Sequence, residues 1–254
     1  MTDIFPIRRI DHIRHYVNNA RQSAYYYQHV FGFSITGFRG LETGSKDQVD
    51  WLCEQGDLRL VFSAPIRPGH PMAPKICEHG DFVQDICFEV DDVDAAYKAA
   101  VGRGAQSAYE PYTLEDDQGS VRMAGIKIYG ETIHSLMNRD KYKGHFLPQF
   151  RKENQPGDPI GIVEVDHCVG NVELGKMNYW VKWYEDVLGF KNMLETVVPT
   201  LHRFPSRSQM LNNEINSIIS DFGDIRKKLK VVGISRLLTK VFVIRLVTDK
   251  RSKC

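Results

Sequence analysis

The stretch DHIRHYVNN at residues 11–19 has an altered copy, DHCVGNV, at residues 166–172. Each copy is followed by an aromatic-rich amphipathic stretch that ends in Gly-Phe, at Gly32 in the first case and at Gly189 in the second. A strand, helix and turn that recur after 155 residues indicate two halves of similar fold. The chain is therefore expected to consist of repeated modules.

The first module surrounds residues 11–19. Alternation predicts a strand at 10–17, and apolar residues at three- and four-residue spacing predict a helix at 20–30 that Gly32 ends. A strand at 33–38 and a hairpin at 50–62 are expected to follow. The order is therefore strand, helix and three strands.

The same order is expected again in the next part of the chain. A strand at 82–90 precedes a helix at 93–102 that Asp92 caps. Residues 111–117 are expected to form a short connector before a hairpin at 121–137. These patterns predict two copies of one small module, and a third copy begins at residue 162.

Charge and pattern divide the chain into four parts. Residues 1–150 hold the first pair of modules, 151–160 form a polar linker rich in Pro and Gly, and 161–194 begin a second domain. Residues 195–254 do not repeat the module and carry 12 Lys and Arg against 5 Asp and Glu, whereas residues 1–194 carry 21 against 27. This step in charge predicts a boundary and a basic tail.

The composition excludes several classes of protein. With 42% hydrophobic and 26% charged residues, the chain has the make-up of a globular domain, and no run approaches the roughly 18 apolar residues of a membrane helix. The N-terminus lacks a basic-then-apolar signal region. Basic residues of the tail are spread out, so we expect no nucleic-acid partner. Five cysteines without a Cys-x-x-Cys pair predict neither disulfides nor a zinc site, and favour the cytoplasm.

Paired strand–helix–three-strand modules resemble the vicinal oxygen chelate superfamily. The segments VDHCVGNVELGKMN (165–178) and WVKWYEDVLGF (180–190) resemble the 4-hydroxyphenylpyruvate dioxygenase family within it. The first half matches that family at 11–13, 58–65, 79–88 and 147–148. The resemblance covers about residues 6–194. It implies an α+β fold of paired βαβββ modules, as in glyoxalase and bleomycin-resistance proteins, with the second barrel incomplete.

The resemblance also implies a chemistry. Enzymes of this family hold Fe(II) with two His and one carboxylate and leave the opposite face open for an α-keto acid and O₂. They oxidatively decarboxylate 4-hydroxyphenylpyruvate and hydroxylate its ring, which gives homogentisate in tyrosine and phenylalanine catabolism. By resemblance, His167 is the first iron ligand, and Val169, on the same side of the strand, contacts substrate. A homo-oligomer is implied as well.

The chain departs from the family after residue 194. The second His, in a Gln-His-Ile-type strand, and the carboxylate, in a Phe-Phe-Glu-type strand, have no counterpart. His202 and Glu214 lie in unmatched contexts and are assigned no ligand role. We therefore expect the C-terminal part to be truncated or replaced and the chain to be inactive. The alternatives are a non-catalytic scaffold or interaction protein of this fold, or a mis-joined coding sequence.

A second candidate metal site lies in the first half. His12 occupies the place there that corresponds to the iron-ligand His, and Asp85 aligns with the missing second His. With Glu131 they are chemically imaginable as a facial triad. We favour a structural role for His12 and a relic of duplication for the set. His70 and His79, near Pro and Gly, are expected to lie in loops.

Overall fold

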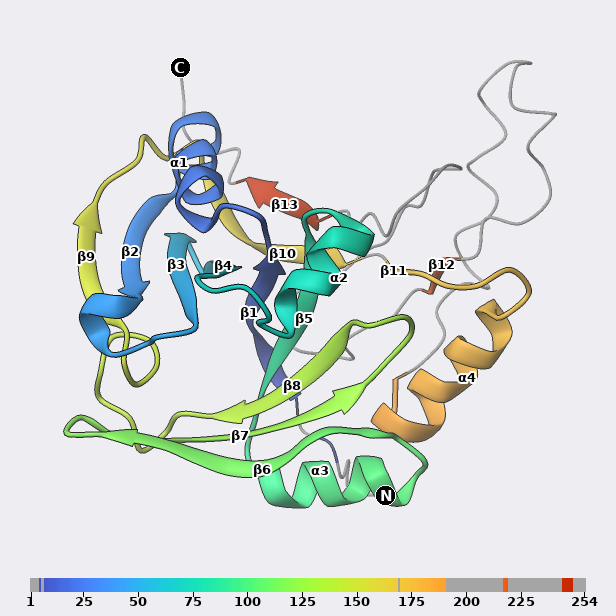
Figure 1. Cartoon of the computed structure of the whole chain (residues 1–254). Coiled ribbons are helices and arrows are strands. Elements are labelled where there is room, and N and C mark those ends of the chain that lie inside the picture. Colours follow the sequence, from blue (N-terminus) through green and yellow to red (C-terminus); the bar gives the residue numbers. More distant parts are fainter. Residues whose placement is uncertain (1–4, 6, 169, 191–216, 219–243, 249–254) are drawn as a thin grey trace, which may run out of the picture.

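The computed structural model describes residue 5 and residues 7–168, 170–190, 217–218 and 244–248 (Figure 1). The first module comprises β1 (Ile7–Tyr16), α1 (Ala20–Phe31), β2 (Ser34–Arg39), a 3₁₀ turn (Leu41–Thr43), β3 (Gln48–Gln55) and β4 (Leu58–Pro65). This order confirms the predicted sequence of strand, helix and three strands. Among all the residues that the structure describes, no helix is long and apolar enough to cross a membrane.

The second module begins with a helix that the sequence pattern did not predict. Its elements are α2 (Met72–His79), β5 (Phe82–Val90), α3 (Val93–Gly102), β6 (Ser107–Asp116), β7 (Gly119–Lys127) and β8 (Ile133–Asn138). The Asp92 side chain accepts the Ala95 N–H, which confirms the predicted helix cap. The predicted connector at 111–117 is wrong, since most of it belongs to β6. His79 is likewise the last residue of a helix and not a loop residue.

The modules join into a nine-stranded sheet. Its order is β6-β7-β8-β5-β1-β4-β3-β2-β9, with β1 and β5 antiparallel at the centre. Each module places its last strand parallel to its first, β4 beside β1 and β8 beside β5. The sheet is therefore built from two equivalent halves, which confirms the paired βαβββ architecture.

The ninth strand corrects the predicted linker. β9 (Arg151–Gln155) pairs antiparallel with β2 at one edge of the sheet, so half of residues 151–160 is strand. Its polar sequence, Arg-Lys-Glu-Asn-Gln, resembles that of a loop. Charged side chains are nevertheless common on edge strands, because they discourage pairing with other chains. The sheet has nine strands and two free edges, and not the eight that two modules alone predict.

Apolar side chains fill both faces of the curled sheet. Helices α1 and α3 lie on its outer side (Figure 1). The larger core cluster includes the α1 and α3 residues Ala24 and Ala96 and the strand residues Ile13 and Phe88. A second cluster, which includes Leu52, Met123 and Phe146, lies apart from it. Strands alternate their side chains between faces, which separates the two clusters.

A strand begins at residue 162, where the sequence predicts the start of a third module. This part of the chain contains β10 (Ile162–Cys168), β11 (Gly170–Asn171) and α4 (Met177–Leu188). β10 pairs antiparallel with β13 (Ile244–Thr248), and β11 with β12 (Ser217–Ile218).

The repeated Gly-Phe ends both α1 and α4 in the same way. Gly32 and Gly189 have left-handed φ values of 69° and 70°, which glycine adopts without steric cost. The amide N–H groups of the two following residues, Phe33 and Phe190, bond back to carbonyls of Tyr27 and Tyr184. The glycine amides themselves donate to the carbonyls of Gln28 and Glu185. This bond is the αL arrangement of a helix C-terminus, which explains why the motif recurs.

The third module packs on the first half. Ile162, Tyr184, Val187 and Leu188 are buried in the same cluster as Ile13 and Phe88. A backbone hydrogen bond also joins the two parts: the Asp57 amide donates to the Val163 carbonyl at 2.6 Å. Residues 161–190 are therefore part of the core that the first half begins.

Candidate functional site

The predicted iron ligand lies in a strand, as expected. His167 belongs to β10, and its backbone pairs with Arg245 of β13. Its side chain is outside the part that the structure describes, and so are Val169, His202 and Glu214. The roles of His167 and Val169 therefore stay predictions.

His12, the counterpart in the first half, is a buried strand histidine. It is 1% exposed, and its Nδ1 lies 2.7 Å from the Asp11 carboxylate. The ring stands edge-on to Phe146 at 5.2 Å between centroids. Nε2 has no hydrogen-bond partner. Because a carboxylate only accepts, the Nδ1–H donates to it, and Nε2 is left as a buried acceptor.

Charges around His12 fix the ionisation of its neighbour. Burial opposes ionisation of Asp11, but the hydrogen bond from His12 and the positive charges of Arg139 and Arg59 lower its pKa to about 2. Arg139 and Arg59 both form ion pairs with this carboxylate. Burial lowers the pKa of His12, so its ring is neutral near pH 7. Asp11 therefore serves as the buried counter-ion of two arginines.

The Asp85 carboxylate accepts hydrogen bonds from strand β8. Its Oδ1 accepts the Ser135 amide N–H at 2.9 Å, and its Oδ2 accepts the Ser135 hydroxyl. The Ser135 hydroxyl oxygen lies 2.6 Å from the hydroxyl of Tyr109 on β6. Burial raises the pKa of the Asp85 carboxyl group. Both carboxylate oxygens are thus used in joining strands.

Glu131 lies beside potential metal ligands other than His12 and Asp85, the two that the sequence suggested. Its Oε2 is 3.0 Å from Nε2 of His79, and an oxygen of Glu78 lies 3.9 Å from the same nitrogen. In the described part of the chain this is the one group of three His, Cys, Asp or Glu whose ligand atoms lie within 4.8 Å. The facial triad of His12, Asp85 and Glu131 is therefore not assembled.

The first half holds a further buried charge cluster that the sequence did not indicate as a unit. Asp50, which has no exposed surface, accepts hydrogen bonds from Arg14 at 3.0 Å and Arg39 at 2.6 Å. Ser63 donates to the same carboxylate. Charged residues at inward strand positions were the available signal, but only the pairing of β2 with β3, β3 with β4 and β4 with β1 brings them together.

The two-His, one-carboxylate iron site of the family is not assembled among the described side chains, because their one cluster of three ligand-type residues holds a single His. A facial triad needs two His and one carboxylate around a shared open face. Asp11, Asp50 and Asp85 are instead occupied by arginine, serine and histidine donors, and apolar residues such as Met123 and Phe146 fill the space between strands. The carboxylates of this interior are therefore committed to bonds within the fold.

Comparison with known proteins agrees with the fold. A model of the glyoxalase/bleomycin resistance protein/dioxygenase superfamily matches residues 9–129. 4-Hydroxyphenylpyruvate dioxygenase of Yarrowia lipolytica is 41% identical over 194 residues, which cover 72% of this chain and 49% of that protein. The enzyme of the same name from Dictyostelium discoideum is 38% identical over 200 residues, 76% of this chain and 54% of its own length.

The chain belongs to the glyoxalase/dioxygenase superfamily, as a homologue of 4-hydroxyphenylpyruvate dioxygenase. It spans about half the length of these relatives. Among solved structures, a mutant 4-hydroxymandelate synthase from Streptomyces coelicolor superposes with a TM-score of 0.61 at 23% identity, covering 73% of this chain and 53% of the other. That similarity concerns the fold.

Proposed function

We propose that this homologue descends from a 4-hydroxyphenylpyruvate dioxygenase and that His167 occupies the position of its first iron ligand. The identity of 41% over 194 residues to the Yarrowia enzyme supports this proposal. The family reaction would convert 4-hydroxyphenylpyruvate and O₂ to homogentisate with Fe(II), in the cytoplasm and as a homo-oligomer. Since one His does not hold Fe(II) tightly and the described side chains supply no partner set, we expect this chain alone to be inactive.

The test is Fe(II) binding together with oxygen uptake in the presence of 4-hydroxyphenylpyruvate. The purified chain is compared with His167→Ala and with His29→Ala, a matched change at an exposed histidine. We expect no stoichiometric iron and no uptake in any of the three. Uptake that His167→Ala abolishes and His29→Ala leaves intact would contradict inactivity and show that other ligands complete the site.

A second candidate function is a non-catalytic scaffold. The occupied interior of the first half favours it, because each buried carboxylate described above is paired or hydrogen-bonded within the sheet. A scaffold would unfold cooperatively and keep its midpoint when Fe(II) is added. An iron-dependent rise in the unfolding midpoint that His167→Ala removes would argue against this role.

A further inference from the structure

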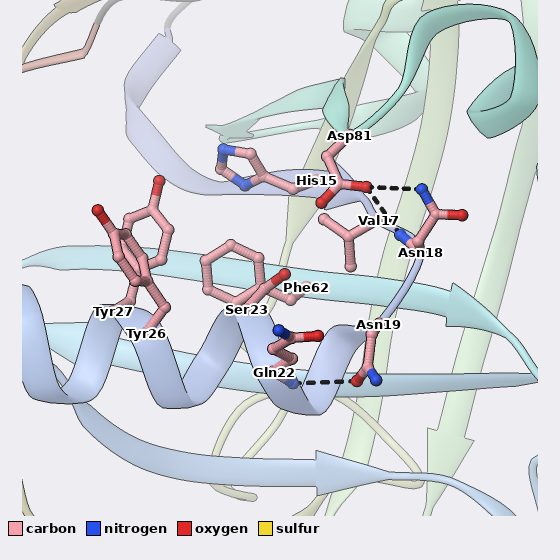
Figure 2. Close-up of a pocket in the computed structure, with 10 residues that line it drawn as sticks. All are labelled: His15, Val17, Asn18, Asn19, Gln22, Ser23, Tyr26, Tyr27, Phe62 and Asp81. Atoms are coloured by element: carbon pink, nitrogen blue, oxygen red, sulfur yellow. Dashed lines mark hydrogen bonds between the residues drawn. The ribbon is translucent and has the colours of Figure 1, made fainter.

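A cavity of about 510 Å³ opens beside the N-terminal half of α1. Figure 2 shows ten residues that line it, from the end of β1, the first turns of α1, strand β4 and the segment before β5. Its volume is in the range of small-molecule sites, which measure about 300–1,000 Å³. These residues played no part in the iron-site prediction.

Aromatic rings form one wall of this cavity. Tyr27 and Phe62 lie 4.8 Å apart between centroids, and His15 lies 5.2 Å from Phe62. Tyr26 stands at the rim and is 52% exposed. Ring faces carry a negative quadrupole, so such a wall attracts planar rings and cations.

A carboxylate forms the opposite side. One oxygen of Asp81 accepts the Asn18 backbone N–H at 2.8 Å and the Asn18 side-chain N–H at 3.2 Å. Figure 2 shows its second oxygen turned away from Asn18, toward His15. A carboxylate oxygen has lone pairs for further donors, so this atom can receive a donor from a ligand.

The cavity carries a net negative charge. Burial lowers the pKa of His15 to about 4, so its ring is neutral near pH 7. No Lys or Arg is found among the ten lining residues, and Asp81 is the one carboxylate there. The His15 Nδ1 is buried and has no hydrogen-bond partner. Such a site disfavours anions, among them α-keto acids, and favours cations with N–H donors.

We propose that this cavity binds a small aromatic amine in its protonated form. Its ring would pack against Tyr26, Tyr27 and Phe62, and its ammonium group would meet the second oxygen of Asp81. The size, the aromatic wall and the single uncompensated carboxylate each support this class of ligand. The inference goes beyond the proposed function and does not depend on iron.

The experiment is calorimetric titration of the full chain with 2-phenylethylamine, 2-phenylethanol and 3-phenylpropionate. These probes share a ring and differ in charge. We expect the amine to bind at least tenfold more tightly than the alcohol, about 1.4 kcal/mol, and the carboxylate to bind most weakly. Absence of amine binding up to about 10 mM, or equal affinity for all three probes, would overturn the proposal.

Variants separate the charge from the ring contacts. Asp81→Asn keeps an acceptor for Asn18 and should reduce amine affinity to that of the alcohol, whereas Asp117→Asn, an exposed change in the β6–β7 turn, should not alter it. Tyr26→Ala should weaken the amine and the alcohol equally. Thermal unfolding of each variant verifies the fold. Amine affinity that survives Asp81→Asn in a folded protein would refute the proposed contact.

Discussion

Two buried carboxylates in adjacent strands show how neighbours decide ionisation. Asp11 on β1 is held charged, with its pKa lowered to about 2, because His12, Arg139 and Arg59 outweigh the effect of burial. Asp85 on β5 bonds to the neutral Ser135, so burial prevails and raises its pKa. Substitution by Asn therefore has opposite expected effects at the two positions.

Asp85→Asn should stabilise the protein near pH 7. The amide removes the cost of a buried charge, and its oxygen still accepts the Ser135 N–H. We expect a gain of about 1 kcal/mol, or 2–4 °C in Tm. Because the folded-state pKa is raised, the wild-type carboxyl group takes up a proton as pH falls, so the gain should shrink at lower pH.

The matched control for that change is Asp11→Asn, which leaves two arginines without their counter-ion. It should lower Tm at pH 7, since breaking a buried ion pair on one side is strongly destabilising. Thermal melts of both variants at pH 7 and at lower pH test the pair. A loss of stability at pH 7 in Asp85→Asn would contradict the assignment of Asp85 as a destabilising charge.

The sequence predicted that His12 and His167 lie in strands, but not which side chains contact their neighbours. The DH motif located His12 and His167 in equivalent strands of two modules, because a motif fixes local structure. Which side chains contact one another depends on the register of the strands and on the segments that connect them. Glu131 meets His79 because of α2, an eight-residue helix that the pattern did not predict.

At the level of elements, α4 is attached to the first half by a buried hydrogen bond. Nε2 of His134 on β8 lies 2.8 Å from the Tyr184 hydroxyl, and its Nδ1 lies 3.1 Å from the Ile86 carbonyl. The carbonyl accepts, so Nδ1 carries the proton and Nε2 accepts from Tyr184. Burial lowers the pKa of His134 to about 4, which keeps this arrangement at neutral pH.

Tyr184→Phe should destabilise the protein without changing the shape of the core. The variant leaves the buried Nε2 of His134 without a donor, at a cost of about 1–3 kcal/mol. Urea unfolding measures the change in the free energy of unfolding. Tyr179→Phe is the control, since Tyr179 is 59% exposed and should change stability by less than about 0.5 kcal/mol. Equal effects of the two variants would refute the contact.

Helices with a cap and an apolar face, α1 and α3, were predicted within one residue, and the buried strands within three. The elements that were missed are polar or short. β6 carries Pro111 and many exposed side chains at the edge of the sheet, where proline is tolerated and alternation is lost. β9 is polar throughout, and only its pairing with β2 makes it a strand.

On the scale of the whole molecule, buried neutral histidines make the fold sensitive to acid. Burial lowers the pKa values of His15 and His134 to about 4 and that of His12 in the same direction. The unfolded chain binds these protons below about pH 6.5, but the folded chain does not until pH reaches about 4. The contribution of these histidines to stability is therefore full above pH 6.5 and falls between pH 6.5 and 4.

The urea concentration at the midpoint of unfolding, determined at several pH values between 7 and 4.5, measures this loss. We expect His134 alone to account for roughly 3 kcal/mol of this loss. His134→Gln should flatten the pH dependence although it lowers stability at pH 7, whereas His29→Gln, at an exposed site, should leave the dependence unchanged. An unchanged midpoint across this range in the wild-type chain would show that the buried histidines do not control its acid stability.

The packing of residues 161–190 on the first half predicts that the first half is less stable when these residues are removed. Ile162, Tyr184, Val187 and Leu188 are each at most 5% exposed and share one cluster with Phe88. A fragment of residues 1–160 would return the surface under these side chains to water, at about 1.5–3 kcal/mol for each large apolar group.

We therefore expect fragment 1–160 to unfold at a markedly lower urea concentration than fragment 1–190 and to bind the dye 1-anilinonaphthalene-8-sulfonate. Fragment 1–190 is the matched control, because it keeps α4 and its contacts. If the shorter fragment is as stable as the longer one and binds no dye, the first half has a self-sufficient core, and β10 and α4 are only attached to it. If the shorter fragment is less stable and binds the dye, the start of the second half is a structural part of the first.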